Sequence, residues 1–337
     1  MMKNRRKISM CILTLTGLAV TAGIVLYILS WSGILLRHGM AVEGRMQPVQ
    51  YEGEHYIYNK DLINVLCLGI DHDHGLDQDV PPGGRGQSDA IFLISLNAKS
   101  REMKILNIPR DLMMPVNIYD SDGDFFNTRT MQITLQYAYG KDGDDSCRKT
   151  AENVSALLLN IPIHRYCAIN FNAVPALNDA VGGVTVRMDS EYVDAELRKL
   201  SPMFTPGNTV HLMGDQSFNF LHVRDTHTYA SCEERAERQK QYIRRYAEAV
   251  KETVKSNPKL LFEMYTILKE NMTTNIGKME LLSFYFYIDK MNLEDALVTV
   301  KGERIQGEFH EEFYADEDAL KRLVVEMFYI LPDNRSE

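Results

Sequence analysis

The feature that most limits how this 337-residue chain can fold is an uncharged segment near its N-terminus. Residues 8–36 contain no charged side chain, and a basic cluster precedes them, made of Lys3, Arg5, Arg6 and Lys7. Roughly 20 apolar residues suffice for a helix that crosses a bilayer, whereas the apolar part of a cleavable signal takes only about 7–15. We therefore expect a transmembrane signal anchor over residues 8–36.

The basic cluster also predicts the orientation of the anchor, because loops rich in Lys and Arg stay on the cytoplasmic side. We expect residues 1–7 to form a cytoplasmic tail and residues 37–60 to form a polar linker outside the cell. The chain would then be a single-pass protein of the cell membrane with an extracellular C-terminal domain. A cleaved signal peptide is the alternative interpretation of the same segment.

Charge excludes one broad class of partner. The chain has 37 Lys and Arg against 46 Asp and Glu, a formal net charge of -9. Generic nucleic-acid binding depends on an excess of cations that neutralise phosphates, so we expect no nucleic-acid partner. Any anionic ligand must meet a local cluster of arginines or a metal ion. The 5 cysteines include no CxxC pair, which excludes a standard zinc module and leaves core packing as their expected role.

Beyond the linker, strand patterns alternate with helix patterns. We expect helices over 150–159 and 233–254, and strands over 63–70, 90–96, 103–108, 166–169, 184–188 and near 296–300. The short polar link at 97–100 predicts an antiparallel hairpin between the second and third strands. Such interleaving indicates an α/β (α+β) fold, with a mixed central β-sheet sandwiched by helices. We expect residues 61–256 to form the catalytic domain and residues 257–337 a C-terminal helical extension packed on it.

Two aspartates stand where a ligand would meet the expected sheet. Asp71 ends the first strand, and Asp89 opens the next one after a Gly-rich loop. Ligands of open α/β sheets bind beyond the carboxyl ends of the strands, and two neighbouring carboxylates can share one divalent cation. Turn formation is the ordinary alternative role for such aspartates.

Arginines recur beside the expected elements. Arg110 follows Pro109 at the end of the third strand, and Arg224 follows a short apolar segment. Further along, Arg235, Arg238 and Gln239 lie on one face of the long predicted helix, because they are spaced three and four residues apart. Surface ion pairs are the alternative role for each of these side chains.

The order of these short motifs is more specific than any one of them. In chain order they are Gly69-Ile70-Asp71, Ser88-Asp89, Pro109-Arg110-Asp111, Tyr137-Ala138-Tyr139-Gly140, Val181-Gly182-Gly183-Val184, Gly214-Asp215-Gln216, Val223-Arg224 and Glu237-Arg238-Gln239. This order strongly resembles the LytR-CpsA-Psr family of bacterial envelope enzymes. The resemblance covers roughly residues 61–256, with a looser match around 272–275, and the family also carries an N-terminal anchor.

The resemblance implies a membrane-anchored phosphotransferase. Such enzymes move an anionic glycopolymer, of the teichoic acid or capsular polysaccharide type, from a polyprenyl-diphosphate carrier to peptidoglycan and form a phosphodiester. By resemblance, Asp71 and Asp89 match the positions that hold Mg²⁺, or Mn²⁺ in its place. Arg110, Arg224 and Arg235 match arginines that grip the diphosphate. Gln239 matches a further phosphate donor, with Arg238 as a helper, and the lipid tail lies in a groove between sheet and helices.

The chain also departs from the family pattern. Gln87 stands where the family often has Arg, and we expect Arg85 to substitute for it at the diphosphate. Thr226 stands where the family has a second arginine after Arg224. Loss of one charge-assisted contact costs about 1.5–3 kcal/mol, so activity would be reduced rather than abolished. Asp111 is the nearest candidate for the general base that activates the acceptor.

Two alternatives remain open at this point. Gln87 and Thr226 allow a catalytically weak protein of the same fold that binds polyprenyl phosphate or glycopolymer without transferring it. A transcriptional attenuator is the least favoured alternative, because the chain is acidic and shows no helix-turn-helix pattern.

Overall fold

This computed structural model describes residues 47–71, 76, 80–189, 195–225, 228, 231–277, 280, 296–308 and 310–332. The expected cytoplasmic tail, the anchor and the first part of the linker lie outside these residues, as does Thr226. Among the helices in the described ranges, none is both long and apolar enough to cross a membrane.

A mixed six-stranded sheet forms the centre of the molecule, with the strand order β11-β8-β3-β4-β5-β12. Its strands are β3 (Leu62–Asp71), β4 (Gln87–Asn97), β5 (Met103–Asn107), β8 (Arg165–Asn170), β11 (Met272–Thr274) and β12 (Leu297–Thr299). β3 pairs with β8, and β5 with β12, in parallel, while the other neighbours are antiparallel. The predicted mixed sheet and the β4–β5 hairpin are confirmed.

Several strands bring polar residues to the same edge of this sheet. β3, β5, β8 and β12 all end there, and β4 begins there because it runs in the opposite direction. In the β3–β4 register Asp71 lies opposite Gln87, and in the β4–β5 register Phe92 lies opposite Asn107. The register shifts between Gly69 and Ile70, so that Asp89 lies at the bulged part of the pairing. This edge is where the sequence predicts a site.

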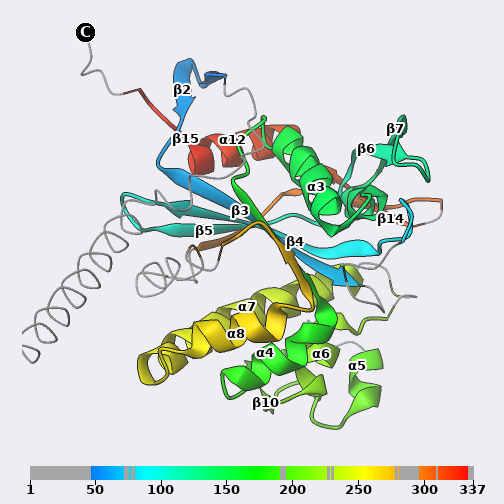
Figure 1. The fold of residues 1–337 in the computed structure, drawn as a ribbon, viewed down its shortest axis with the longest axis vertical. Coiled ribbons are helices and arrows are strands. Elements are labelled where there is room, and N and C mark those ends of the chain that lie inside the picture. Colours follow the sequence, from blue (N-terminus) through cyan, green and yellow to red (C-terminus); the bar gives the residue numbers. More distant parts are fainter. Residues whose placement is uncertain are drawn as a thin grey trace, which may run out of the picture.

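Helices cover both faces of the sheet, as Figure 1 shows. On one face α3 (Gly143–Leu157) and α12 (Glu317–Phe328) pack on a core that includes Leu66, Leu93 and Leu106, all fully buried. On the other face α7 (Ser231–Ser256) packs Ile243 and Ala247 near Phe92 and Ile105. The predicted helical sandwich is confirmed.

A second core lies on the far side of α7. It joins α7 to α4 (Val174–Ala180), β9 (Val184–Arg187), α5 (Ala195–Leu200), β10 (Thr209–Leu212), α6 (Asp215–His222) and α8 (Leu260–Leu268). Phe204 and Phe220 are almost fully buried in it. Because apolar side chains of α7 contribute to this core as well as to the sheet core, the helix is fixed between the two.

Among its described residues, the C-terminal segment 257–337 contains strands as well as the helices α8 and α12. It supplies both outer strands of the central sheet, β11 and β12, and the hairpin of β13 (Gly302–Gln306) and β14 (Glu311–Ala315). β12 lies within 296–300, where the sequence predicts a strand, whereas the 3 residues of β11 are too few for an alternating pattern to show. The described part of the segment therefore belongs to the same fold.

The predicted linker also contains strands. β1 (Val49–Tyr51) and β2 (Glu54–Tyr58) form a three-stranded sheet with β15 (Tyr329–Ile330) near the C-terminus. Tyr58 packs edge to face on Tyr329, with ring centroids 6.1 Å apart. The remaining hairpin, β6 (Met113–Tyr119) and β7 (Phe125–Gln132), leads into the 3-10 helix η1 (Ile133–Tyr139).

Candidate active site

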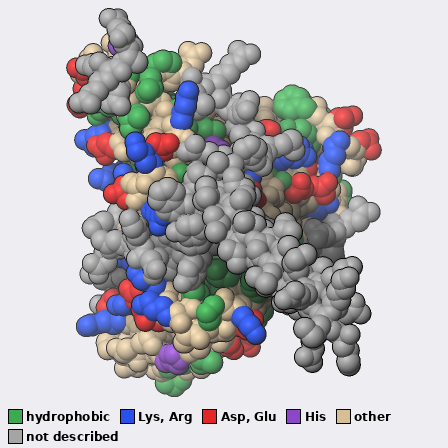
Figure 2. Space-filling view, turned by 60° about the vertical axis from the view of Figure 1, so that its left-hand side comes forward, with side chains coloured by type: hydrophobic (Ala, Val, Ile, Leu, Met, Phe, Trp, Pro, Cys, Tyr) green, Lys and Arg blue, Asp and Glu red, His purple; other side chains and the backbone are tan. Residues whose placement is uncertain are grey.

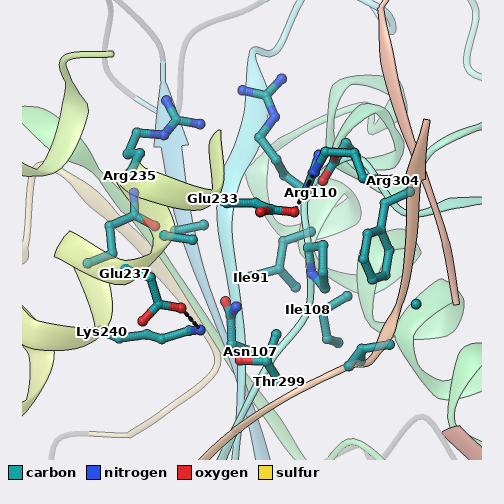
Figure 3. A pocket seen from close by; sticks show the side chains of 18 of the residues that line it. Ile91, Asn107, Ile108, Arg110, Glu233, Arg235, Glu237, Lys240, Thr299 and Arg304 are labelled. Carbon is teal, nitrogen blue, oxygen red and sulfur yellow. Dashed lines mark hydrogen bonds and ion pairs between the residues drawn. The ribbon is translucent and has the colours of Figure 1, made fainter. Parts of the chain in front are cut away.

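A cavity of about 770 Å³ opens at the polar edge of the sheet. Its walls come from the ends of β4, β5 and β12, from the first turns of α7 and from the β13–β14 hairpin. Figure 3 shows Arg235 and Glu237 entering from α7 on one side, and Arg110 and Arg304 on the other. Ile91 and Ile108 form part of its apolar floor.

Asp89 holds two arginines at this cavity. Its carboxylate pairs with Arg110 through one oxygen, and its other oxygen lies 3.4 Å from Nη1 of Arg235. The Asp89 side chain is only 5% exposed, so both ion pairs are shielded from water. Arg110 also donates to Oε1 of Gln87 at 2.7 Å. The structure thus brings together Asp89, Arg110 and Arg235, as the sequence predicts.

Asp71 occupies a more open position on the same edge. Its side chain is 46% exposed, and its Oδ2 lies 3.2 Å from Nε2 of His222. The His222 ring stacks on Phe218 and meets Phe171 edge to face. Phe171 in turn packs on Gly69, where an added Cβ would lie 2.8 Å from the Phe171 ring. The glycine of the first motif therefore leaves room for the wall beside Asp71.

The donor chemistry of this edge suits Mg²⁺. Asp71 and Asp89 offer hard carboxylate oxygens from adjacent strands, and Mg²⁺ takes only one or two protein carboxylates when phosphates and waters complete its shell. Within the described ranges no group of three or more His, Cys, Asp or Glu side chains is placed to hold a metal ion.

Two other predicted phosphate donors make contacts within the protein. Arg224 donates to Oγ of Ser231 at 3.3 Å. Arg238 is almost fully buried and donates to the carbonyls of Phe220, at 2.9 Å, and Val223. These carbonyls lie at the end of α6, where helix carbonyls lack helical partners. In this structure the Arg238 guanidinium is thus directed at the backbone that follows α6, and its role as a helper at the diphosphate stays a prediction.

Gln239 and Arg85 also donate to backbone carbonyls. Gln239 lines the cavity, although its amide also donates to the Leu221 carbonyl at 3.2 Å. Arg85 is buried and donates to the carbonyls of Gly140, at 3.0 Å, and Lys141, where the chain enters α3. In this structure its guanidinium is turned toward the backbone, and the substitution of Arg85 at the diphosphate stays a prediction.

Arg304, which sequence reasoning did not find, lies at the centre of a charged group on the cavity wall. It pairs with Asp111, with Oε1 of Glu233 at 2.9 Å and with Oε2 of Glu311 at 3.4 Å. Burial lowers the pKa of Arg304, and the neighbouring Glu311 acts in the opposite direction. No motif of the sequence analysis contains this residue, because all of those motifs lie within residues 61–256. Asp111, the expected general base, is 5% exposed and faces Arg304.

Neither Cys67 nor Cys167 lines the cavity. Cys67 and Cys167 lie opposite each other on β3 and β8. Burial raises the pKa of the Cys67 thiol, and it raises the pKa of Cys167 to about 12. Both thiols are therefore protonated and poorly nucleophilic at neutral pH.

Comparison with known proteins identifies relatives of this chain. TagU of Bacillus anthracis, described as a polyisoprenyl-teichoic acid–peptidoglycan teichoic acid transferase, is 32% identical over 168 residues, which cover 50% of this chain and 46% of TagU. TagV of Bacillus subtilis, described in the same way, is 25% identical over 218 residues, which cover 64% of this chain and 50% of TagV. The chain thus spans about half the length of the curated relatives it matches.

Solved structures share the fold. A structure described as TagT bound to LIIa-WTA has a TM-score of 0.59 and 22% identity, covering 87% of this chain and 96% of that one. The crystal structure of Bacillus subtilis TagV has a TM-score of 0.60 and 22% identity, covering 80% and 98%. The model of the LytR_cpsA_psr family matches residues 40–327, so this chain belongs to the LytR-CpsA-Psr family.

Proposed function

We propose that the chain is a membrane-anchored phosphotransferase that moves an anionic glycopolymer from a polyprenyl-diphosphate carrier to peptidoglycan. The observation that carries this proposal is the pair of guanidinium groups, Arg110 and Arg235, that meet on Asp89 at the cavity. A diphosphate concentrates negative charge, and planar arginine donors bind phosphate oxygens in pairs. Phosphoryl transfer depends mostly on such positioning and charge stabilisation.

The metal would sit beside these arginines. We infer that Asp71 and Asp89 hold Mg²⁺, or Mn²⁺ in its place, whose charge would offset that of the diphosphate. In that state Asp89 shares its oxygens between the cation and the two arginines. Arg110 and Arg235 would turn part of their donor capacity to the phosphate oxygens.

We infer that the polyprenyl chain would lie along the face of the sheet that α7 covers. Partly buried apolar side chains on that face include Cys67, Ile94, Met103 and Leu297. A polyprenyl chain lying along this face would keep its diphosphate at the edge of the sheet, beside Arg110 and Arg235. On the opposite face Val154 and Leu158 are fully buried in the core.

The relatives support the glycopolymer as cargo. TagU and TagV are described as transferases of teichoic acid to peptidoglycan, and the solved TagT is described as bound to LIIa-WTA. We extend that activity to this chain by proposal, with a teichoic acid or a capsular polysaccharide as the transferred polymer.

A transfer assay tests the proposal. The full chain in detergent is incubated with Mg²⁺, a polyprenyl-diphosphate-linked glycopolymer and peptidoglycan, and the linked product is measured by mass spectrometry. We expect a phosphodiester-linked product that disappears when a chelator removes Mg²⁺ and returns when Mg²⁺ is restored. Donor that binds but never transfers would favour the binding protein instead, an alternative supported by the contact between Arg110 and Gln87.

Membrane topology needs a separate test. We propose that residues 8–36 anchor the chain with residues 1–7 inside the cell. A reporter that is active only outside the cytoplasm, fused after residue 332, should be active. An inactive reporter would contradict the envelope function and favour the transcriptional attenuator.

On the face shown in Figure 2, basic and acidic side chains are interspersed, which suits a nucleic-acid partner poorly.

A further inference from the structure

Three carboxylates surround Arg304, and they differ in their access to a ligand. Asp111 comes from the corner after β5, Glu311 from β14, and Glu233 from the first turn of α7. The side chains of Asp111 and Glu311 are 5% and 18% exposed, whereas that of Glu233 is 56% exposed. Of the three, Glu233 is therefore the carboxylate that an incoming molecule can reach.

Glu233 is also held in place over the cavity. Its Oε1 accepts a hydrogen bond from Nε of Arg304 at 2.9 Å, and it belongs to the residues that line the cavity. Figure 3 shows Glu233 reaching from α7 across the cavity to Arg304, with Arg110 beside it. Its other oxygen, Oε2, is the one left to face a ligand in this geometry.

The geometry around Arg304 fixes the direction of this carboxylate. One guanidinium contacts three carboxylates, and the Arg304 side chain itself is only 8% exposed. Asp111 and Glu311 hold the Arg304 guanidinium from the protein side, and its Nε is directed at Glu233. Arg304 is in turn fixed by the Phe313 ring, whose centroid lies 5.6 Å from the guanidinium carbon.

We propose that Glu233, oriented by Arg304, is the general base that accepts the proton of the acceptor hydroxyl. This rests on the proposed function. The hydroxyl oxygen forms a new bond to the phosphorus that carries the glycopolymer, and the bond from that phosphorus to the bridging oxygen breaks. Polyprenyl phosphate leaves with the bond's electrons, and the hydroxyl proton moves to Oε2 of Glu233. Asp111 is a positioning residue that helps to hold Arg304.

Conservative variants test this role. General-base catalysis typically contributes 10²–10⁴-fold, so Glu233→Gln should lower kcat by at least about a hundredfold. Its Kd for inorganic pyrophosphate in the presence of Mg²⁺ should change by less than about threefold, because the donor is bound by Arg110 and Arg235. Glu233→Asp keeps a carboxylate and should retain more activity than Glu233→Gln.

Glu248→Gln is the matched control. Glu248 lies on the same helix α7 outside the cavity lining, is 56% exposed like Glu233, and is also paired with an arginine, Arg245, at 2.9 Å. It should keep kcat within about threefold of the native value. For the orienting residue, Arg304→Lys should retain more kcat than Arg304→Met at equal pyrophosphate affinity.

The outcomes separate this inference from the function on which it rests. A native chain that transfers no glycopolymer would overturn both. A native chain that transfers while Glu233→Gln keeps its kcat would overturn only the role of Glu233. The same holds if Glu233→Gln loses pyrophosphate affinity as strongly as it loses kcat, because the residue would then serve donor binding.

Discussion

At the scale of single residues, Asp89 and Asp71 are expected to contribute very differently to stability. Removal of one partner of a buried ion pair leaves an uncompensated charge and costs about 3–5 kcal/mol, and Asp89 serves two arginines at 5% exposure. We expect Asp89→Ala to lower the free energy of unfolding by about 3 kcal/mol, measured by urea denaturation. Asp71→Ala, at an exposed position, should cost less than about 1 kcal/mol. Equal losses would contradict the buried role of Asp89.

Two arginines one turn apart on α7 offer a second contrast. Arg235 faces the cavity, whereas Arg238 faces the carbonyls that follow α6. Loss of a charge-assisted contact costs about 1.5–3 kcal/mol, so Arg235→Met should weaken pyrophosphate binding roughly tenfold to a hundredfold in calorimetry. Arg238→Met should leave this affinity unchanged but lower the free energy of unfolding by about 2 kcal/mol, because buried carbonyls lose their donor. If Arg238→Met weakened pyrophosphate binding and Arg235→Met lowered only the stability, the roles of the two arginines would have to be exchanged.

From the sequence, a site residue could be identified only where its residue type also indicates its role. Asp89 and Arg110 each belong to a motif of fixed order, and Arg235 lies on the same predicted helix face as one such motif; the structure brings the three side chains together. Arg238 and Arg85 have the same chemistry, yet their guanidinium groups satisfy backbone carbonyls that only the folded chain brings near. Arg304 gave no signal, since a single arginine on a short strand resembles any surface residue.

At the scale of elements, the first turn of α3 should make stability depend on pH. Burial raises the pKa of Asp145, but hydrogen bonds from Lys149 and from the Lys141 amide outweigh it, so the pKa lies below its ordinary value of 3.8. A lowered folded pKa stabilises the protein above the unfolded pKa, and this stabilisation is lost as pH falls through the folded value. The affected range is therefore below about pH 4.

Asp145→Asn tests that dependence. The variant should be less stable than the native chain at neutral pH, and it should lose less stability between about pH 4 and about pH 2, measured by urea denaturation at each pH. Glu248→Gln, in an exposed pair with Arg245, serves as the control and should follow the native acid profile. Parallel acid profiles for Asp145→Asn and the native chain would show that another carboxylate dominates.

Elements with a strong pattern could be predicted, and short ones could not. The sequence indicated α7, β4 and β5 because each carries a sustained helical or strand pattern. β11 was missed, since 3 residues cannot show a period. β12 was expected near 296–300, but its pairing with β5, like that of β11 with β8, is set by neighbours far away in the chain. The same holds for β1 and β2, whose partner β15 lies near the other end of the chain.

At the scale of the whole molecule, the chain after α7 is needed for the central sheet. It supplies the two outermost strands of that sheet, β11 and β12, and it supplies β13, which places Arg304 at the cavity. We expect a chain ending at residue 256 to lack a cooperative thermal transition in calorimetry, because two core strands would lose their neighbours. A chain ending at residue 332 should unfold like the native one. Cooperative unfolding of the shorter chain would show that the first 256 residues fold alone.

The placement of β12 and β13 also has a consequence for biosynthesis. Arg110 and Asp89 leave the ribosome before Arg304 does, so the growing polypeptide carries an incomplete cavity until β13 has been made. A nascent chain that lacks β12 and β13 is therefore expected to be inactive. If the chain is exported as we propose, its cavity is completed only where β12 and β13 join the rest of the fold, on the outer side of the membrane.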